Sequence, residues 1–245
     1  MIDRAIATAS DANYFIGLNA MLNSVRAHEP ELPVFIFDCG LTEWQLEHLK
    51  AKGFEIVVPK GLEGPEWEHI TRATYARFSC CFLPARKILY LDSDVIVVGF
   101  LDEIFKHDCP LGACREDGMP VWTNFHGRDV LKHYNINPDN PSFNGGVLLI
   151  DVEYWGERFY EEYLDKLSKW KHEFKFVDQS CLNLIAYENC EFDFLPKKWN
   201  TFHYELEKYP DFRIIHYHMS TKPWHNSFQH GPALELWKKY SDYWK

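Results

Sequence analysis

The stretch Lys87–Val98 reads Lys-Ile-Leu-Tyr-Leu-Asp-Ser-Asp-Val-Ile-Val-Val, and it decides how the rest of the chain is interpreted. Ile88–Leu91 is a short apolar run rich in β-formers, which is typical of a strand buried on both faces of a parallel sheet. The run stops at Asp92-Ser93-Asp94, and an apolar pattern then resumes. In open α/β sheets, ligands bind outside the carboxyl ends of the strands, which is where these acids would lie.

Two interpretations of this acidic segment remain open. Two carboxylates between hydrophobic runs repel each other, and desolvating them unpaired costs several kcal/mol. A hard divalent cation would accept their oxygens as ligands and neutralise the pair. Alternatively, the segment is a strand-to-turn junction with two solvated aspartates, because Asp and Ser are ordinary turn residues.

Length and composition limit the classes of protein. A chain of 245 residues can form one α/β domain, and we expect residues 1–245 to do so. The net charge of −10 argues against non-specific binding to nucleic acid or anionic membranes. The first residues lack an apolar core of the signal-peptide kind, and no 18-residue apolar span occurs, so we expect neither a signal peptide nor a membrane span. Seven cysteines without Cys-x-x-Cys spacing predict reduced, mostly buried thiols and a cytoplasmic protein.

Strand and helix patterns alternate along the chain. Strands are predicted at 4–9, 32–37, 54–58, 88–91, 110–114, 147–150 and 213–216, and helices at 15–27, 43–52, 72–83, 101–105, 154–170, 177–187 and 232–244. This alternation predicts a mostly parallel central sheet flanked by helices, with right-handed crossovers. Thr42 and Gln45 have capping-box spacing. Residues 115–142 show no clear periodicity, which is typical of a segment that carries binding residues or a lid.

Two basic side chains near the C-terminus could join the acids. His216 closes an apolar run and would project beside Asp92 and Asp94 if the two strands are neighbours. An imidazole and two carboxylates would leave open positions for phosphate oxygens on Mn²⁺ or Mg²⁺, although a lone histidine at a strand end is more often just a polar tip. Lys222 precedes a proline and could bind phosphate as a point charge, or it could be a solvated surface lysine. We expect His218 to face away from the acids.

Asn144-Gly145-Gly146 is a further candidate binding segment. An amide side chain followed by two residues without side-chain bulk lets the backbone approach a ligand closely, but a bulge or hairpin turn gives the same sequence.

Other site classes have no support. The chain has no Walker sequence, no Gly-x-Gly-x-x-Gly and no Gly-x-Ser-x-Gly, which argues against P-loop, dinucleotide-binding and Ser-His-Asp hydrolase functions.

Six short motifs occur in a fixed order along the chain. They are Tyr75-Ala76-Arg77, Leu91-Asp92-Ser93-Asp94-Val95, Phe143-Asn144-Gly145-Gly146-Val147, Asp178-Gln179, Leu195-Pro196-x-x-Trp199-Asn200 and His216-x5-Lys222-Pro223-Trp224. Together they resemble family 8 of the retaining glycosyltransferases, over about residues 6–224. The resemblance implies a GT-A fold, which is a Rossmann-like α/β fold, and a UDP-glucose or UDP-galactose donor. It also implies a nucleotide-binding half of about 1–98 and an acceptor-side half of about 99–245.

The resemblance also implies roles for individual residues. Asp92, Asp94 and His216 match the family's ligands for Mn²⁺ or Mg²⁺, and Ser93 lies within that Asp-x-Asp segment. Lys222 matches the lysine that holds the diphosphate. Asp178 and Gln179 match the pair beside the reacting anomeric carbon. Positions that grip uridine are Ala7, Ser10, Asp11 and Tyr14, and positions that hold the donor sugar are Arg77, Asp94, Asn144 and Gly145, with Glu116 or Asp117 as a further acid.

The function predicted on this basis is metal-dependent, retaining transfer of glucose or galactose from a UDP-sugar to a hydroxyl acceptor. The acceptor could be a glycan, a lipid-linked sugar or a protein, and we expect it to contact residues 118–142 and 199–210. A homodimer is a further possibility for the protein. No nucleic-acid partner is expected. We favour front-face attack, since Asp178 is the one carboxylate offered for a double displacement. The alternatives are a nucleotidyltransferase and a UDP-sugar-binding protein without transfer activity. One departure is Met219, which stands where the family often has a glycine.

Overall fold

The structure is a computed structural model that describes residues 1–60, 72–229 and 231–242. Within these residues the central sheet has seven strands in the order β3-β2-β1-β4-β7-β6-β8. Their bounds are β1 Ile2–Ser10, β2 Val34–Asp38, β3 Glu55–Val57, β4 Ala85–Leu91, β6 Leu111–Pro120, β7 Pro141–Asp151 and β8 Asp193–Leu195. The α-helices are α1 Phe15–His28, α2 Glu43–Ala51, α3 Asp129–His133, α4 Val152–Trp155, α5 Arg158–Trp170, α6 Val177–Asn189 and α7 Gly231–Tyr240.

The direction of strand β7 determines which residues meet at the edge of the sheet. Strands β1 to β4 pair in parallel, as predicted, whereas β7 runs antiparallel to both β4 and β6. The amino end of β7 therefore lies next to the carboxyl end of β4, with Leu91 opposite Val147. The backbone N–H of Asp92 donates to the carbonyl oxygen of Gly146 at 2.8 Å, which extends the pairing beyond β4. This register brings Asn144-Gly145-Gly146 beside the acidic segment.

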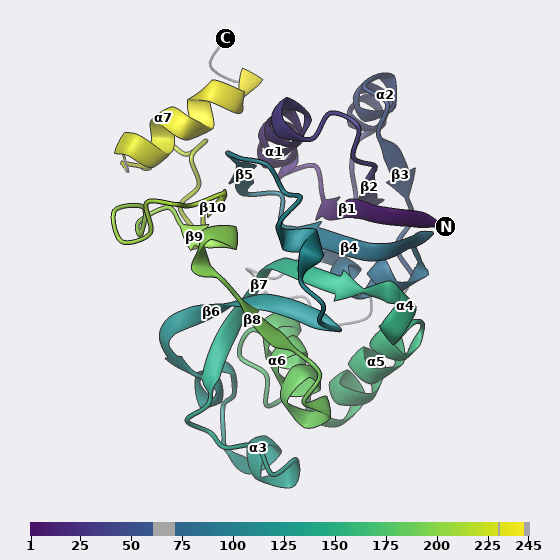
Figure 1. The fold of residues 1–245 in the computed structure, drawn as a ribbon, viewed down its shortest axis with the longest axis vertical. Helices are drawn as coiled ribbons and strands as arrows, with labels where there is room; N and C mark the ends of the chain where they lie inside the picture. The colour runs from purple at the N-terminus through teal and green to yellow at the C-terminus, as the bar shows by residue number, and fades with distance from the viewer. Residues whose placement is uncertain (61–71, 230, 243–245) are drawn as a thin grey trace.

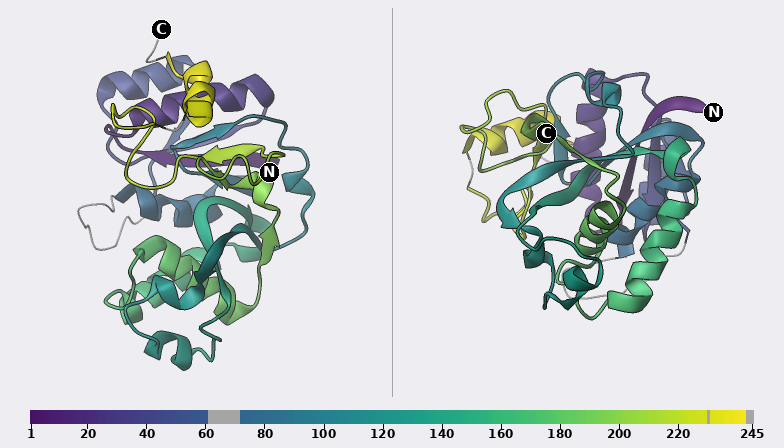
Figure 2. Two further views of the ribbon diagram at one scale, coloured as in Figure 1. Left: turned by 90° about the vertical axis from the view of Figure 1, so that its left-hand side faces the viewer. Right: turned by 60° about the horizontal axis from the view of Figure 1, so that its bottom comes forward.

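The central strands are buried on both faces, as the apolar run at 88–91 predicted. Helices α1 and α2 lie on one side of the sheet, and α4, α5 and α6 lie on the other (Figures 1 and 2). In β4, Ile88 and Tyr90 join the core cluster on the α4–α6 side, whereas Leu89 and Leu91 join the cluster on the α1 side. The strand presents alternate residues to the two faces, so continuous hydrophobicity is required.

A second, three-stranded sheet begins directly after the acidic segment. It consists of β5 (Val95–Val97), β9 (Thr201–Phe202) and β10 (Ile214–His216) in the order β5-β10-β9. Strands β5 and β10 are antiparallel, with His216 opposite Val95. Figure 1 shows this sheet and α7 beside α1. The turn between β4 and β5 therefore joins the two sheets.

Several predicted elements differ in the structure. Arg72–Phe82 forms 3₁₀ turns instead of an α-helix, and Ile104–Lys106 is a 3₁₀ turn that overlaps only the end of the short helix predicted at 101–105. The helix predicted at 154–170 is two helices, separated at Gly156, whose φ of +50° ends α4. The segment 115–142 is more regular than predicted, because β6 continues to Pro120 and α3 follows.

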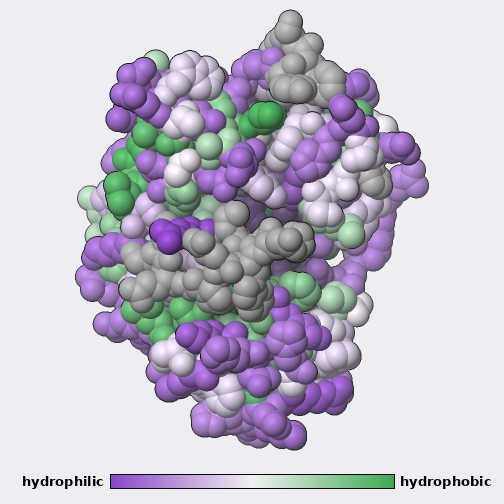
Figure 3. Space-filling view, turned by 180° about the vertical axis from the view of Figure 1, so that it is seen from behind, coloured by the Kyte–Doolittle hydropathy of each residue, from purple (hydrophilic) through white to green (hydrophobic). Residues whose placement is uncertain are grey.

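Other details of the fold agree with the sequence. Thr42 and Gln45 form the predicted capping box at the start of α2. All seven cysteines are free, and five of them are buried. The predicted helix at 232–244 runs to Tyr240 in the structure, while residues 243–245 lie outside the described residues. Hydrophilic residues predominate on the face in Figure 3. None of the helices in the described ranges has the length and apolar character needed to cross a bilayer.

Candidate active site

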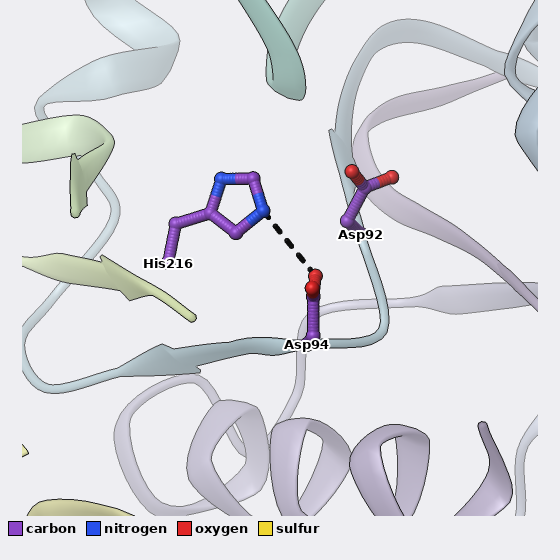
Figure 4. A group of neighbouring side chains, drawn as sticks. All are labelled: Asp92, Asp94 and His216. Carbon is purple, nitrogen blue, oxygen red and sulfur yellow. Dashed lines mark ion pairs between the residues drawn. The ribbon is translucent and has the colours of Figure 1, made fainter. Parts of the chain in front are cut away.

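The two acids and the histidine that the sequence singled out meet where the two sheets join. Asp92 and Asp94 lie on the turn between β4 and β5, and His216 ends β10 (Figure 4). The Nε2 atom of His216 lies 3.3 Å from Oδ1 of Asp94, and one ligand atom from each of the three residues lies within 4.8 Å of the others. Two carboxylates and an imidazole are a donor set that fits Mn²⁺ or Mg²⁺.

Each acid of this group also has its own buried cation. Lys222 Nζ lies 2.6 Å from Asp94 Oδ2, and Arg77 Nη2 lies 3.0 Å from Asp92 Oδ1. Burial alone would raise the pKa of Asp94, but Lys222 and His216 outweigh it and hold that pKa well below its usual range. Asp94 is therefore ionised, and a protein cation lies beside each of the two acids.

Arg77 connects three segments of the site. Its Nη2 also lies 3.1 Å from Asp178 Oδ2, its Nη1 donates to the carbonyl oxygen of Gly145 at 2.5 Å, and its Nε donates to that of Thr74 at 2.9 Å. Burial opposes the charge of Arg77, yet the two aspartates raise its pKa. Burial raises the pKa of Asp178, with Arg77 acting against that rise. The guanidinium is thus a buried cross-link at the floor of the site.

The two glycines of β7 make room for site residues. A Cβ on Gly145 would lie 2.4 Å from Arg77 Nη1, and a Cβ on Gly146 would lie 2.3 Å from His216 Cε1. The sequence suggested that these glycines let the backbone approach a ligand. In the structure, the space that they leave is occupied by the guanidinium and the imidazole.

Gln179 is held at both ends of its amide. Its Oε1 accepts from Asn144 Nδ2 at 3.2 Å, and its Nε2 donates to Glu116 Oε2 at 3.2 Å and to Asn124 Oδ1 at 3.3 Å. Burial raises the pKa of Glu116. Asp117, the alternative acid, is instead bonded at the surface to Lys208 and a tyrosine. Glu116 is therefore the acid that faces the site.

These side chains line one cleft. The main cavity has a volume of about 810 Å³, which lies within the range of small-molecule sites, roughly 300–1,000 Å³. A smaller recess of about 140 Å³ adjoins it and shares several lining residues. Predicted residues that line one or both are Ser10, Asp11, Tyr14, Arg77, Asp92, Ser93, Asp94, Asn144, Gly145, Asp178, Gln179, His216 and Lys222.

The nucleotide-side residues begin at the end of β1. Asp11 Oδ1 accepts from the backbone N–H groups of Asn13 and Tyr14 at 2.9 and 3.0 Å, which satisfies two donors of the turn that leads into α1. The side chain of Ala7 is fully buried in the core and does not reach the cleft. Ala9 lines the recess instead. Strand β1 lies inside the sheet and both of its faces are covered by the core, so Ala7 has no exposed side.

His218 differs from its expected position. Residues two apart in extended backbone share a face, so His218 lies on the same side as His216, with their ring centroids 5.7 Å apart. It lines the cleft and stacks on Phe202, and burial lowers its pKa to about 3. The expectation that His218 faces away from the acids was therefore wrong, because alternate residues of a strand point to the same side.

Two further cleft residues were not among the predicted site residues: Phe176 carried no signal in the sequence, and Met219 was noted there only as a departure from the family. Phe176 and Met219 both line the cleft and are 45% and 62% exposed. Met219 has a φ of +83°, which is the left-handed region that favours glycine, so the chain keeps a glycine-like backbone at this position. In the aromatic segment 199–210, Trp199 and Phe202 are buried in the core and present no surface to an acceptor, whereas Tyr204 is exposed.

Comparisons with known proteins show which family the chain resembles over nearly its whole length. The family model described as "Glycosyl transferase family 8" matches residues 5–227. Glycosyltransferase GlyE of Streptococcus pneumoniae is 29% identical over 268 residues, which cover 97% of this chain and 61% of GlyE. General stress protein A of Bacillus subtilis is 25% identical, over 98% of this chain and 93% of that protein. The chain thus spans about three fifths of the length of GlyE.

Solved structures show the same fold. The galactosyltransferase LgtC, solved with donor and acceptor sugar analogues, superposes with a TM-score of 0.75 at 22% identity, over 96% of this chain and 95% of LgtC. The apo form of GlyE from Streptococcus pneumoniae superposes with a TM-score of 0.71 at 26% identity, over 98% of this chain and 60% of GlyE. The GT-A fold predicted from the sequence is thereby confirmed.

Proposed function

Because the chain belongs to glycosyltransferase family 8, we propose that it transfers glucose or galactose from a UDP-sugar to an acceptor hydroxyl, with retention of anomeric configuration. The observation that carries this proposal is the meeting of Asp92, Asp94 and His216 beside Lys222 in one cleft. A net charge of −10 repels phosphorylated substrates, so the donor requires such local positive charge.

Asp92, Asp94 and His216 would hold Mn²⁺ or Mg²⁺. When bound, the cation would act as a Lewis acid that neutralises charge on the leaving diphosphate. Lys222 would supply a second positive centre for the same phosphates, since its ammonium is buried against Asp94 at the wall of the cleft. Placed charges and donors of this kind contribute roughly 3–4 kcal/mol each to transition-state stabilisation.

The sugar end of the site supports front-face attack. Asp178 is held in an ion pair with Arg77 at 3.1 Å, which makes its carboxylate a poor nucleophile for a double displacement. In the front-face reaction, the bond from the anomeric carbon to the diphosphate oxygen breaks and a bond to the acceptor oxygen forms on the same face. The leaving diphosphate takes the acceptor's proton. Gln179, whose amide is fixed at both ends, would stabilise the cation-like sugar.

Other parts of the sequence prediction stay predictions. They include the division into a nucleotide-binding half and an acceptor-side half, the cytoplasmic location and the homodimer. We propose a glycan, a lipid-linked sugar or a protein hydroxyl as acceptor. The family assignment removes the support for a nucleotidyltransferase. A UDP-sugar-binding protein without transfer activity is an outcome that the experiment below would detect.

The proposal is tested by hydrolysis and transfer assays with UDP-, GDP- and CMP-sugars, with and without Mn²⁺. We expect turnover of a UDP-hexose that requires Mn²⁺, and loss of that turnover in Asp92→Asn and Asp94→Asn. Asp108→Asn is the matched control, because its carboxylate is fully exposed outside the cleft. Metal-independent turnover at the wild-type rate in either site variant would contradict the assignment. Binding of a UDP-sugar without turnover would indicate the binding-only alternative.

A further inference from the structure

A row of side-chain amides connects the histidine of the acidic group to Gln179. Asn200 is fully buried, and its Oδ1 lies 3.0 Å from His216 Nδ1. Its Nδ2 donates to Asn144 Oδ1 at 3.0 Å, and Asn144 Nδ2 donates in turn to Gln179 Oε1 at 3.2 Å. The row ends where Gln179 Nε2 donates to Glu116 at 3.2 Å.

The direction of this row is fixed by the backbone. The N–H of Gly146 donates to Asn144 Oδ1 at 2.9 Å, and a main-chain N–H cannot accept, so that atom of Asn144 must be the oxygen. Asn200 must therefore present its NH₂ group to Asn144 and its oxygen to His216. The N–H of Gly145, which donates to Gln179 Oε1 at 3.4 Å, sets the same direction farther along.

This direction determines which ring nitrogen of His216 carries a proton. Because Asn200 Oδ1 only accepts, Nδ1 of His216 must donate, whether or not the ring is charged. Nε2 then faces Asp94 Oδ1 at 3.3 Å, on the side of the acidic pair. Histidine ligands are commonly oriented in this way, through a hydrogen bond from the nitrogen that does not bind the metal.

The chain places Asn200 by burial and strand pairing. Trp199 before it is fully buried, and the backbone N–H of Asn200 donates to the carbonyl oxygen of Lys197 at 3.0 Å. Thr201 after it pairs with Ile215 in the parallel β9–β10 ladder. Asn200 is therefore fixed on both sides next to the strand that carries the histidine.

We propose that Asn200 is a positioning residue with two roles. It holds His216 with Nε2 directed at Asp92 and Asp94, and through Asn144 it sets the orientation of the Gln179 amide. The proposal rests on the proposed function, since the metal and the anomeric centre at the two ends of the row belong to it. The sequence singled out Asn200 within a motif and gave it no role.

Two substitutions separate the two roles. Asn200→Leu removes both hydrogen bonds at nearly constant shape, and we expect it to weaken Mn²⁺ binding by about 10–100-fold and to lower kcat. Asn200→Asp keeps an acceptor for His216 Nδ1 but places a second oxygen against Asn144 Oδ1. We expect it to bind Mn²⁺ at least as tightly as wild type while kcat still falls. If Asn200 had only a structural role, Mn²⁺ affinity and kcat would fall together in both variants.

The readouts are Mn²⁺ titration by electron paramagnetic resonance without nucleotide, kcat for the UDP-sugar, and ¹⁵N NMR of His216 in metal-free protein. Asn183→Leu is the matched control for Mn²⁺ binding, because Asn183 is equally buried but bonds the backbone of Phe143 and of Gln179 at the end of the row away from His216. Its Mn²⁺ affinity should equal that of wild type even if its melting temperature falls.

Wild-type Mn²⁺ affinity and kcat in Asn200→Leu would overturn the proposal, and so would an imidazole protonated at Nε2 alone in the wild-type protein. If the wild type neither binds Mn²⁺ nor turns over a nucleotide sugar, the proposed function fails. The NMR measurement still decides the inference in that case, because a proton on Nδ1 that becomes mobile in Asn200→Leu supports it.

Discussion

At the scale of single residues, the site balances its charges before any cation binds. Lys222 and Asp94 form an ion pair whose side chains are 7% and 8% exposed. Removing one partner of a buried pair leaves an uncompensated charge, at a typical cost of about 3–5 kcal/mol. The diphosphate lysine proposed here would therefore also stabilise the metal-free protein.

We predict that Lys222→Met lowers the melting temperature of metal-free protein, and that Mn²⁺ restores part of the loss because a cation again faces Asp94. The measurement is thermal unfolding with and without Mn²⁺. Lys132→Met is the control, since the side chain of Lys132 is 75% exposed in its pair with Asp129 and exposed pairs contribute about 0–1 kcal/mol. Equal melting temperatures for the two variants would contradict the prediction.

The pH dependence of this ion pair follows from the directions of the two pKa shifts. Burial raises the pKa of Asp94, but Lys222 and His216 lower it below its ordinary 3.8, so its contribution is present above that pH and is lost as pH falls through the folded value. Burial lowers the pKa of Lys222, but Asp94 raises it above 10.5, so its contribution is present below that pH and is lost as pH rises through the folded value. The stability difference between wild type and Lys222→Met should therefore shrink in strong acid, where Asp94 gains a proton, and in strong base, where Lys222 loses one.

At the scale of elements, helix α1 packs closely against the acidic turn at Gly17, which has no side chain. A Cβ on Gly17 would lie 2.6 Å from the carbonyl oxygen of Ser93 and 2.8 Å from the ring of Trp224. Trp224 in turn packs edge-on against Tyr14, with ring centroids 5.7 Å apart. The glycine therefore allows the helix, the acidic turn and the segment after Lys222 to approach one another closely.

Gly17→Ala should destabilise the protein by about 1–3 kcal/mol and weaken Mn²⁺ binding, although alanine favours helices, because the backbone of the acidic turn must shift. Urea unfolding and Mn²⁺ titration measure the two effects. Gly231→Ala in α7 is the control, since among the described residues no atom outside its own helix and its chain neighbours lies within 4 Å of its added Cβ. A Gly17→Ala protein as stable as Gly231→Ala, with wild-type Mn²⁺ affinity, would disprove the close approach.

Local sequence patterns predicted the elements that depend on local chemistry. The apolar run of β4 and the Thr42 capping box both appear in the structure, because burial on two faces and helix capping are encoded within a few residues. Elements that depend on distant partners were missed. Strand β5 belongs to a second sheet only because β10, more than a hundred residues later, pairs with it. Strand β6 continues through the polar residues Arg115–Asp117, whose pattern carries no strand signal.

In the candidate site, too, local motifs identified some residues, whereas residues that depend on distant contacts were missed. The ordered motifs identified most of the residues that line the cleft, whereas Asn200 received no role, because its importance lies in two hydrogen bonds to residues 16 and 56 positions away. Met219 could be noticed as a departure from the family, but its left-handed backbone is visible only in the structure.

At the scale of the whole molecule, the cleft lies where two sheets and three distant segments meet. Asp92 and Asp94 join the sheets, His216 comes from the small sheet, and Asn144 comes from the central one. A ligand that binds only when these segments are assembled stabilises the folded state by mass action, by about 2.7 kcal/mol at a concentration of 100 times Kd. Binding at the cleft should therefore raise the melting temperature of the whole protein.

We predict that UDP and Mn²⁺ together raise the melting temperature by more than the sum of their separate effects. Each supplies a charge that the other needs, since UDP brings phosphate oxygens to the cation and the cation offsets the repulsion between those phosphates and the acids. Differential scanning fluorimetry with UDP, Mn²⁺ and both measures this coupling. Asp94→Asn should reduce the combined shift to that of UDP alone, whereas Asp108→Asn, which changes an exposed carboxylate, should retain it. A combined shift that is additive in wild type and survives Asp94→Asn would show that the cation and the nucleotide bind independently, outside the acidic turn.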